Sequence, residues 1–206
     1  MMRLNRRNML VGGGALAGLG LAGTPALAID LEALNKAPAL GEMAMGPEDA
    51  KVTVIEYASA TCPHCAAFYK DTFGALKSEY IDTGKIRFLF REYPHNDAAL
   101  AAFMLARCAP KEKYFALMDI FFTTQPQWTQ SPREGLLNIA KQTGFSEESF
   151  NKCLSDEALA KSIIEGRTIA EGFGVTGIPT FFINGEVLNG EQKIEDLRKI
   201  IDPLLG

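Results

Sequence analysis

Histidine and cysteine, the residues that form most structural zinc sites, are scarce in this chain. Its 206 residues include two histidines and four cysteines. Structural zinc needs four ligands, which are usually supplied as two closely spaced pairs. One such pair occurs, Cys62 and Cys65, and neither a second CxxC nor an HxxxH spacing accompanies it. The missing second pair argues against a zinc site, and we expect no metal and no organic cofactor.

A surplus of basic residues is also missing. The chain has 21 Lys and Arg against 25 Asp and Glu, a net charge of −4. Arg3, Arg6 and Arg7 lie in a leader without acidic residues, so removing the leader leaves 18 basic against 25 acidic residues, or −7. An acidic protein without a basic tract has no electrostatic footprint for DNA or RNA. We therefore expect no nucleic-acid partner.

The leader contains the longest stretch without charge, from Met9 to Ala28. It follows a basic start and ends in Ala26-Leu-Ala28, a small-residue cleavage pattern, so we expect an export signal cleaved near Ala28 and a periplasmic mature protein. The segment Asn5-Arg-Arg-Asn-Met-Leu10 resembles a twin-arginine signal. An uncleaved membrane anchor is the alternative, and the six glycines in the stretch make it a poor one.

Two cysteines separated by two residues, Cys62 and Cys65, directly follow an apolar strand pattern. Apolar residues at helical spacing come next, and Pro63 suits the first turn of a helix. Cys62 then lies at the helix N-terminus, where free N–H groups and the macrodipole favour its thiolate. His64 adds a donor or a positive charge in the same turn, and Cys65 is within reach of a disulfide. The pattern indicates a redox site.

The rest of the chain contains both strand and helix patterns, which predicts the α/β class. The predicted strands cover 52–57, 86–91, 180–183 and 186–188, with a short edge strand near 42–45. The predicted helices cover 66–80, 98–108, 111–124, 131–144, 146–154, 157–172 and 193–205. Asn184-Gly185 is a two-residue hairpin signal. Five consecutive helices between strands indicate an insertion and not an alternating β/α arrangement.

Three segments together resemble the DsbA family of exported thiol-disulfide oxidoreductases. They are Gly46-Pro-Glu-Asp-Ala-Lys-Val-Thr-Val-Ile-Glu-Tyr, Cys62-Pro-His-Cys65 and the distant Gly177-Ile-Pro-Thr-Phe181. The resemblance covers nearly all of the chain after the leader, and it implies a thioredoxin-like fold with an inserted helical domain beside the CxxC site. The expected divisions are a signal peptide (1–28), a lead-in (29–45), the first part of the core (46–95), the helical insertion (96–172) and the second part of the core (173–206).

The resemblance also implies roles for residues outside the CxxC motif. Ile178 and Pro179 match the family's cis-proline loop, which lies against the cysteines and offers backbone groups to an extended substrate. Glu56 is an acid inside an apolar strand, and the family carries an acid at the matching place. If Glu56 is buried, its pKa rises and it could relay a proton to or from Cys65, with Arg91 as a candidate partner. A solvated strand end is the alternative.

His95 and Trp128 carry weaker signals. His95 lies in Tyr93-Pro-His-Asn, a turn composition, and is most simply a surface loop residue. Trp128 either lines a substrate groove or covers the core at its rim.

Cys108 and Cys153 are expected to form a second, structural disulfide. Both fall at the ends of predicted helices, and they are the cysteines left over in a protein expected to enter an oxidising compartment. The alternative is two buried free thiols, because cysteine often behaves as a small hydrophobic residue.

The expected function is therefore that of a dithiol oxidase, which donates the Cys62–Cys65 disulfide to unfolded or reduced exported proteins. The resemblance implies that a membrane quinone-linked partner of the DsbB type reoxidises the pair. One alternative is an isomerase or reductase that uses the same cysteines in reduced form. Another is a non-enzymatic holdase, which would keep working with Cys62 replaced.

Overall fold

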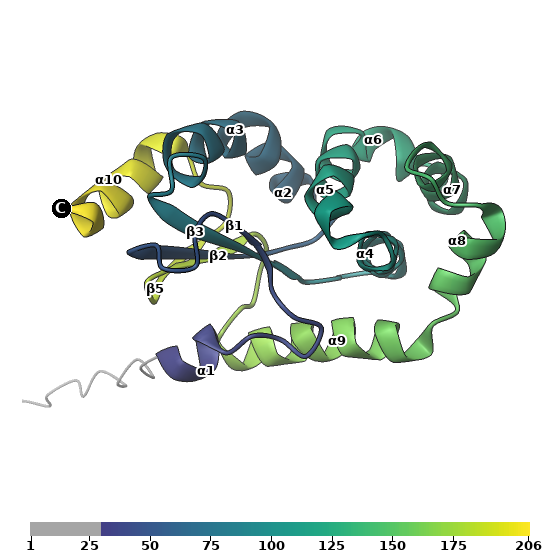
Figure 1. Ribbon diagram of the computed structural model, residues 1–206, viewed down its shortest axis with the longest axis horizontal. Helices are drawn as coiled ribbons and strands as arrows, with labels where there is room; N and C mark the ends of the chain where they lie inside the picture. Colours follow the sequence, from purple (N-terminus) through teal and green to yellow (C-terminus); the bar gives the residue numbers. More distant parts are fainter. Residues whose placement is uncertain (1–29) are drawn as a thin grey trace, which may run out of the picture.

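The computed structural model describes residues 30–206. They contain one five-stranded sheet with the strand order β1-β3-β2-β4-β5, and helices cover the sheet (Figure 1). The strands are β1 (Met43–Met45), β2 (Val52–Ala58), β3 (Ile86–Glu92), β4 (Thr180–Ile183) and β5 (Glu186–Asn189). β2 and β3 run parallel, and the other neighbouring strands pair antiparallel. The predicted export signal and its cleavage site lie outside the described residues.

The sheet separates two hydrophobic cores because side chains alternate between its faces along each strand. Val52 and Val54 face the larger core, whereas Ile55 and Tyr57 face the smaller one. Figure 1 shows α2, α3 and α10 on one side of the sheet and α1 and α9 on the other. Almost every residue of β2 and β3 is buried, as expected for two central strands that are covered on both faces.

One helical stretch follows the CxxC motif and begins earlier than expected. It consists of α2 (Pro63–Phe68), η1 (Tyr69–Phe73), α3 (Gly74–Leu76) and η2 (Lys77–Ile81). The predicted helix over 66–80 starts three residues too late, because Pro63 is already the first helical residue. η1 and η2 are π-helical turns, which the apolar spacing did not predict. Such turns frequently accompany functional sites.

The helical insertion consists of short helices packed on one another and on the sheet. They are α4 (Asp97–Cys108), η3 (Lys111–Lys113), α5 (Tyr114–Thr123), α6 (Gln125–Trp128), α7 (Pro132–Gln142), α8 (Glu147–Leu154) and α9 (Glu157–Gly172). Asn96 caps α4, since its side chain accepts a hydrogen bond from the Ala99 N–H. The predicted helix over 111–124 opens as the 3₁₀ turn η3, and α6 was not predicted.

The elements at both ends of the described chain pack near the sheet or extend it. In the lead-in, α1 (Leu31–Asn35) was not predicted, and its Leu34 is buried in the smaller core. At the other end, Asn184 and Gly185 both have positive φ in the turn between β4 and β5, as a tight hairpin requires. The closing helix α10 (Ile194–Leu205) packs near β2.

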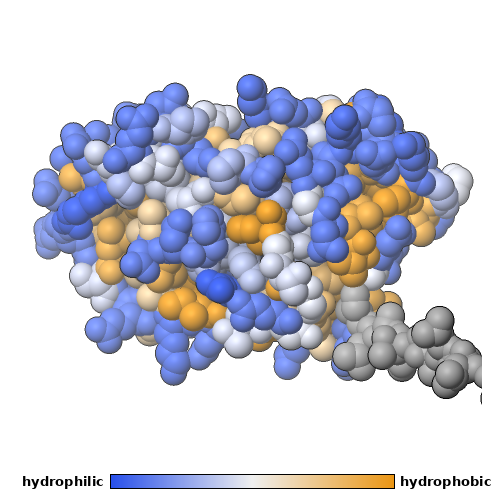
Figure 2. All heavy atoms as spheres, turned by 180° about the vertical axis from the view of Figure 1, so that it is seen from behind, coloured by the Kyte–Doolittle hydropathy of each residue, from blue (hydrophilic) through white to orange (hydrophobic). Residues whose placement is uncertain are grey.

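The face of the molecule in Figure 2 is mainly hydrophilic, with separate apolar patches between hydrophilic residues. The large hydrophobic side chains that are more than a third exposed are Leu31, Ile164, Ile169 and Leu204. Within residues 30–206, every helix is too short or too polar to cross a membrane.

Candidate active site

Cys62 and Cys65 lie where β2 and its following turn meet the first residues of α2. Cys62 is the N-cap of α2, and Pro63 occupies the first turn. The Ile178–Pro179 peptide bond is cis, and the Ile178 carbonyl oxygen lies 3.6 Å from the Cys62 Sγ. The fold thus brings together Cys62 and a loop that is more than 100 residues away in sequence. Cys65 is completely buried, whereas Cys62 retains 7% exposure.

The two cysteines have opposite electrostatic environments. A hydrogen bond from the Cys65 thiol, assisted by the backbone N–H groups of Cys65 and His64 and by the charge of His95, lowers the pKa of Cys62 to about 6 against the opposing effect of burial. Burial raises the pKa of Cys65 far above its ordinary value, and the neighbouring Cys62 raises it further. Near neutral pH the pair therefore holds a thiolate at Cys62 and a thiol at Cys65.

His64 contributes to the site through its backbone more than through its ring. Its N–H donates to the Cys62 sulfur. Its imidazole is 74% exposed, and the Nδ1 atom lies 3.6 Å from a carboxylate oxygen of Glu191. The ring therefore lies mostly in water beside an acid, and its expected support of the thiolate stays a prediction.

Glu56 is fully buried in β2 and is not a solvated strand end. Neither of its carboxylate oxygens has a hydrogen-bond partner among the described residues. Burial raises the pKa of Glu56 to about 8, and its charge raises the pKa of Cys65. At neutral pH the side chain is mainly the neutral acid, which can give up a proton inside the protein.

The prediction that Arg91 is the partner of Glu56 is wrong. In the parallel register Glu56 lies opposite Phe90, whereas Arg91 lies opposite Tyr57 and projects to the other face of the sheet. There its guanidinium donates to the Tyr57 hydroxyl at 2.8 Å and pairs with Glu42. This buried ion pair fastens the lead-in to β3, and among residues 30–206 Glu56 has no counterion.

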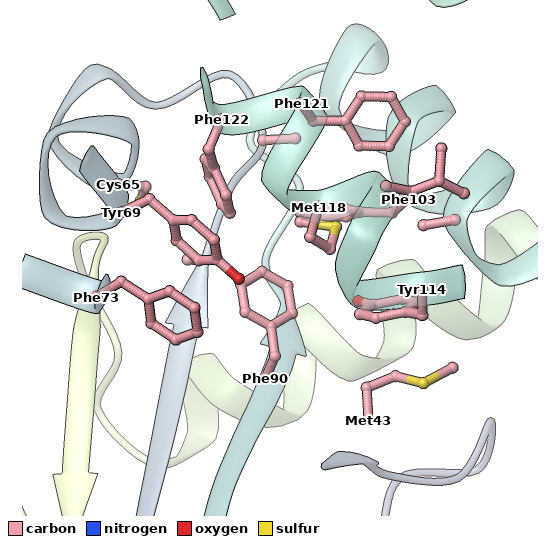
Figure 3. Close-up of a cluster of buried hydrophobic side chains, with 14 of the residues drawn as sticks. Met43, Cys65, Tyr69, Phe73, Phe90, Phe103, Tyr114, Met118, Phe121 and Phe122 are labelled. Carbon is pink, nitrogen blue, oxygen red and sulfur yellow. The ribbon is translucent and has the colours of Figure 1, made fainter. Parts of the chain in front are cut away.

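Aromatic side chains form the low-dielectric environment behind Cys65. Tyr69 and Phe73 of η1 stack at 4.2 Å between ring centroids, and the Tyr69 ring packs on Phe122 of α5 at 4.4 Å. Figure 3 shows these rings between Cys65, β3 and α5. Burial beside these apolar rings destabilises an ionised group, which explains the raised pKa values of Cys65 and Glu56.

Gln125 of α6 is a site residue that sequence reasoning missed. Its buried amide donates to the carbonyl oxygens of Ala60 at 2.8 Å and Cys62 at 3.1 Å. The insertion thereby holds the turn that carries the first cysteine. A lone glutamine before a proline has no distinctive spacing, so only the folded chain reveals this contact.

The structure also places the two residues with weaker sequence signals. Trp128 is 2% exposed, and its indole N–H donates to the Phe121 carbonyl, so it belongs to the core and lines no groove. His95 is an exposed loop residue, as expected, and its Nδ1 also lies 2.7 Å from the Ser59 hydroxyl.

Cys108 at the end of α4 and Cys153 in α8 form a disulfide with a Cα–Cα distance of 6.1 Å. The bond joins two helices of the insertion. It lies in a different part of the fold from Cys62 and Cys65, which are both free thiols.

Comparison with known proteins places this arrangement in a family. A family model described as Thioredoxin matches residues 38–203. The chain belongs to the thioredoxin family. One relative of this chain is a putative protein-disulfide oxidoreductase of Rickettsia bellii. The two are 38% identical over 165 residues, which are 78% of this chain and 63% of the relative. The chain thus spans less than two thirds of the length of that rickettsial relative.

Solved structures match the chain over more of their own length. Alpha-DsbA1 of Wolbachia pipientis superposes with a TM-score of 0.77 at 28% identity, over 84% of this chain and 96% of that one. A protein named probable disulfide bond formation protein D of Bacillus anthracis is 27% identical over 78% of this chain and 77% of its own length. The expected resemblance to DsbA proteins and the thioredoxin-like α/β fold are confirmed.

Proposed function

We propose that the protein is an exported thiol:disulfide oxidoreductase that donates the Cys62–Cys65 disulfide to reduced proteins in the periplasm. The observation that carries the proposal is the contrast between the two sulfurs, since the pKa of Cys62 is lowered to about 6 while burial raises that of Cys65. A thiolate exists only in the reduced pair, so stabilising it favours the reduced state and makes the disulfide an oxidant.

The reaction begins when a substrate thiolate attacks the Sγ of Cys62 in the disulfide. The Cys62–Cys65 bond breaks, and its electron pair leaves on Cys65, which takes up a proton because its thiol form is strongly favoured. Glu56, a neutral acid below about pH 8, is the nearby proton donor in this proposal. A second substrate thiolate then attacks the substrate sulfur of the mixed disulfide and releases Cys62 as a thiolate. The substrate loses two electrons, and the pair gains them.

The cis-proline loop and the insertion have supporting roles in the proposal. The Ile178 carbonyl beside Cys62 supplies a backbone acceptor for an extended substrate. Pro179 has no N–H to compete for the sulfur. A membrane quinone-linked protein of the DsbB type is the proposed reoxidant, and the Cys108–Cys153 disulfide is proposed to be structural.

The reduction potential of the Cys62/Cys65 pair should depend on pH with a change of slope. Below the Cys62 pKa of about 6, reduction takes up two protons, and above it reduction takes up one. The potential should therefore fall by about 59 mV per pH unit at acidic pH and by about 30 mV per unit at neutral pH. Equilibration with glutathione at several pH values measures both slopes.

Two variants separate the proposed oxidase from the alternatives. Cys62→Ala should lose dithiol oxidase activity on a reduced peptide, whereas a holdase would still suppress aggregation of an unfolded protein. Cys65→Ala has no disulfide to donate, so it should also lose oxidase activity. Its Cys62 thiolate should instead attack a disulfide-containing peptide and remain in the mixed disulfide, because Cys65 is no longer present to attack the Cys62 sulfur and release the peptide. A potential as reducing as that of thioredoxin, about −270 mV, would instead favour the reductase or isomerase reading.

Export is a separate part of the proposal and has its own measurement. The leader ends in Ala26-Leu-Ala28, so the exported protein should have an intact mass that corresponds to a chain beginning near Ile29. Recovery of a chain that retains Met1 in the membrane fraction would replace this interpretation with an uncleaved anchor.

A further inference from the structure

The turn before Cys62 contains a residue, Ser59, whose backbone contacts both cysteines. Its carbonyl oxygen accepts the Cys62 N–H at 3.0 Å, and its own N–H lies 3.5 Å from the Cys65 Sγ. Ser59 is completely buried. Its position therefore helps to fix the two sulfurs relative to each other, although it lies outside the CxxC motif.

The Ser59 hydroxyl is held from the far side by His95, which comes from the loop between β3 and α4. His95 Nδ1 lies 2.7 Å from the Ser59 Oγ, and Nε2 lies 3.5 Å from the Thr61 Oγ1 and 3.3 Å from the Asn96 Nδ2. The ring thus spans the turn that enters the active site. A protonated imidazole there adds a positive charge that acts on Cys62.

Charged groups of two helices lie near the His95 ring without forming an ion pair with it. Asp97 of α4 and Arg167 and Glu171 of α9 line the same hollow as His95. Arg167 pairs with Glu171 at 2.8 Å and donates to the Pro94 carbonyl at 3.0 Å, so these two charges offset each other. In residues 30–206, no carboxylate oxygen comes within ion-pair distance of the His95 ring, unlike the His64 ring beside Glu191.

We propose that His95 is a positioning residue of the redox pair, which holds Ser59 through a hydrogen bond and, whenever its ring is protonated, places a positive charge that favours the Cys62 thiolate. The inference rests on the proposed redox function of Cys62 and Cys65. It assigns to His95 the electrostatic role that the sequence pattern suggested for His64. The neutral ring keeps the bond to Ser59 but loses the charge, so the two contributions can be separated by substitution.

The test titrates Cys62 by its thiolate absorbance near 240 nm in the protein with the Cys108–Cys153 disulfide intact. His95→Gln keeps an amide that can bind Ser59 but removes the charge, and it should raise the Cys62 pKa by about half a unit, as expected for one charge screened by water. The equilibrium constant with glutathione should shift about threefold toward the disulfide form. His95→Lys keeps a positive charge and should leave the Cys62 pKa nearly unchanged.

His64→Gln is the matched comparison, and it should raise the Cys62 pKa by less than His95→Gln does. Thermal unfolding of each variant verifies that the fold is retained. A Cys62 pKa that is unchanged in His95→Gln, or that rises equally in His95→Lys, would overturn the inference while leaving the proposed function in place. A wild-type Cys62 that titrates near 8.5, the ordinary cysteine value, would overturn both.

Discussion

Replacing Glu56 by leucine is expected to stabilise the protein by about 3 kcal/mol at pH 7. Burial raises the pKa of Glu56 from 4.5 to about 8, so the folded protein must keep or take up a proton that the unfolded chain releases. A raised carboxyl pKa costs no stability below about pH 4.5. The cost grows as the pH rises toward 8, where it reaches its maximum. Leucine removes this cost because it does not ionise.

The slope of stability against pH is the decisive measurement, since packing changes at residue 56 add a term that does not depend on pH. Urea unfolding of wild type and Glu56→Leu at several pH values between 4.5 and 8 should show a difference that widens steadily. Glu56→Gln should remove the same pH-dependent contribution to stability as Glu56→Leu, although it leaves a buried amide in place. Glu186→Leu, at an exposed position on β5, should change little. Parallel curves for wild type and Glu56→Leu would contradict the raised pKa.

Breaking the Cys108–Cys153 disulfide is expected to destabilise the protein by about 4 kcal/mol in the chain-entropy model. The bond closes a loop with a sequence separation of 45 residues. Removing it allows the unfolded chain many more conformations, whereas α4 and α8 keep their packing in the folded state. The loss should therefore appear mainly as a lower free energy of unfolding and not as a different fold.

The measurement needs a background in which reductant acts on one disulfide alone. Cys62→Ser/Cys65→Ser provides it, and its urea midpoint should fall when reductant is added. The same background with Cys108→Ala/Cys153→Ala should have a urea midpoint near that of the reduced protein, and reductant should not change this midpoint. Identical midpoints with and without reductant would mean that the second disulfide contributes nothing to stability.

The order of strands and helices could be predicted from the sequence because it depends on local periodicity. The buried strands β2 and β3, the hairpin at Asn184-Gly185 and the helix after Pro63 each have a signal within about ten residues. The resemblance of three segments added the thioredoxin-like fold. These local patterns are also sufficient to identify Cys62 and Cys65 as the candidate redox pair.

The partners of the site residues could not be predicted in the same way, because they depend on how distant segments meet. Whether Arg91 faces Glu56 is decided by the register between β2 and β3, which the alternation within one strand does not fix. His95 reaches Ser59 across a gap of 36 residues, and Gln125 reaches Ala60 across 65. No sequence spacing of a single histidine or glutamine predicts a contact over such a distance along the chain.

The hydrogen bonds from Gln125 limit how far the active site can be grafted onto another thioredoxin-like scaffold. The carbonyl oxygen of Ala60 receives its donor from α6, which belongs to the insertion and not to the sheet that carries the cysteines. A thioredoxin scaffold given only the Cys-Pro-His-Cys sequence would lack this donor, and a buried carbonyl without one costs about 1 to 3 kcal/mol. The chemistry of the motif is therefore a property of the whole domain, and grafting it would require residues 96–172 as well.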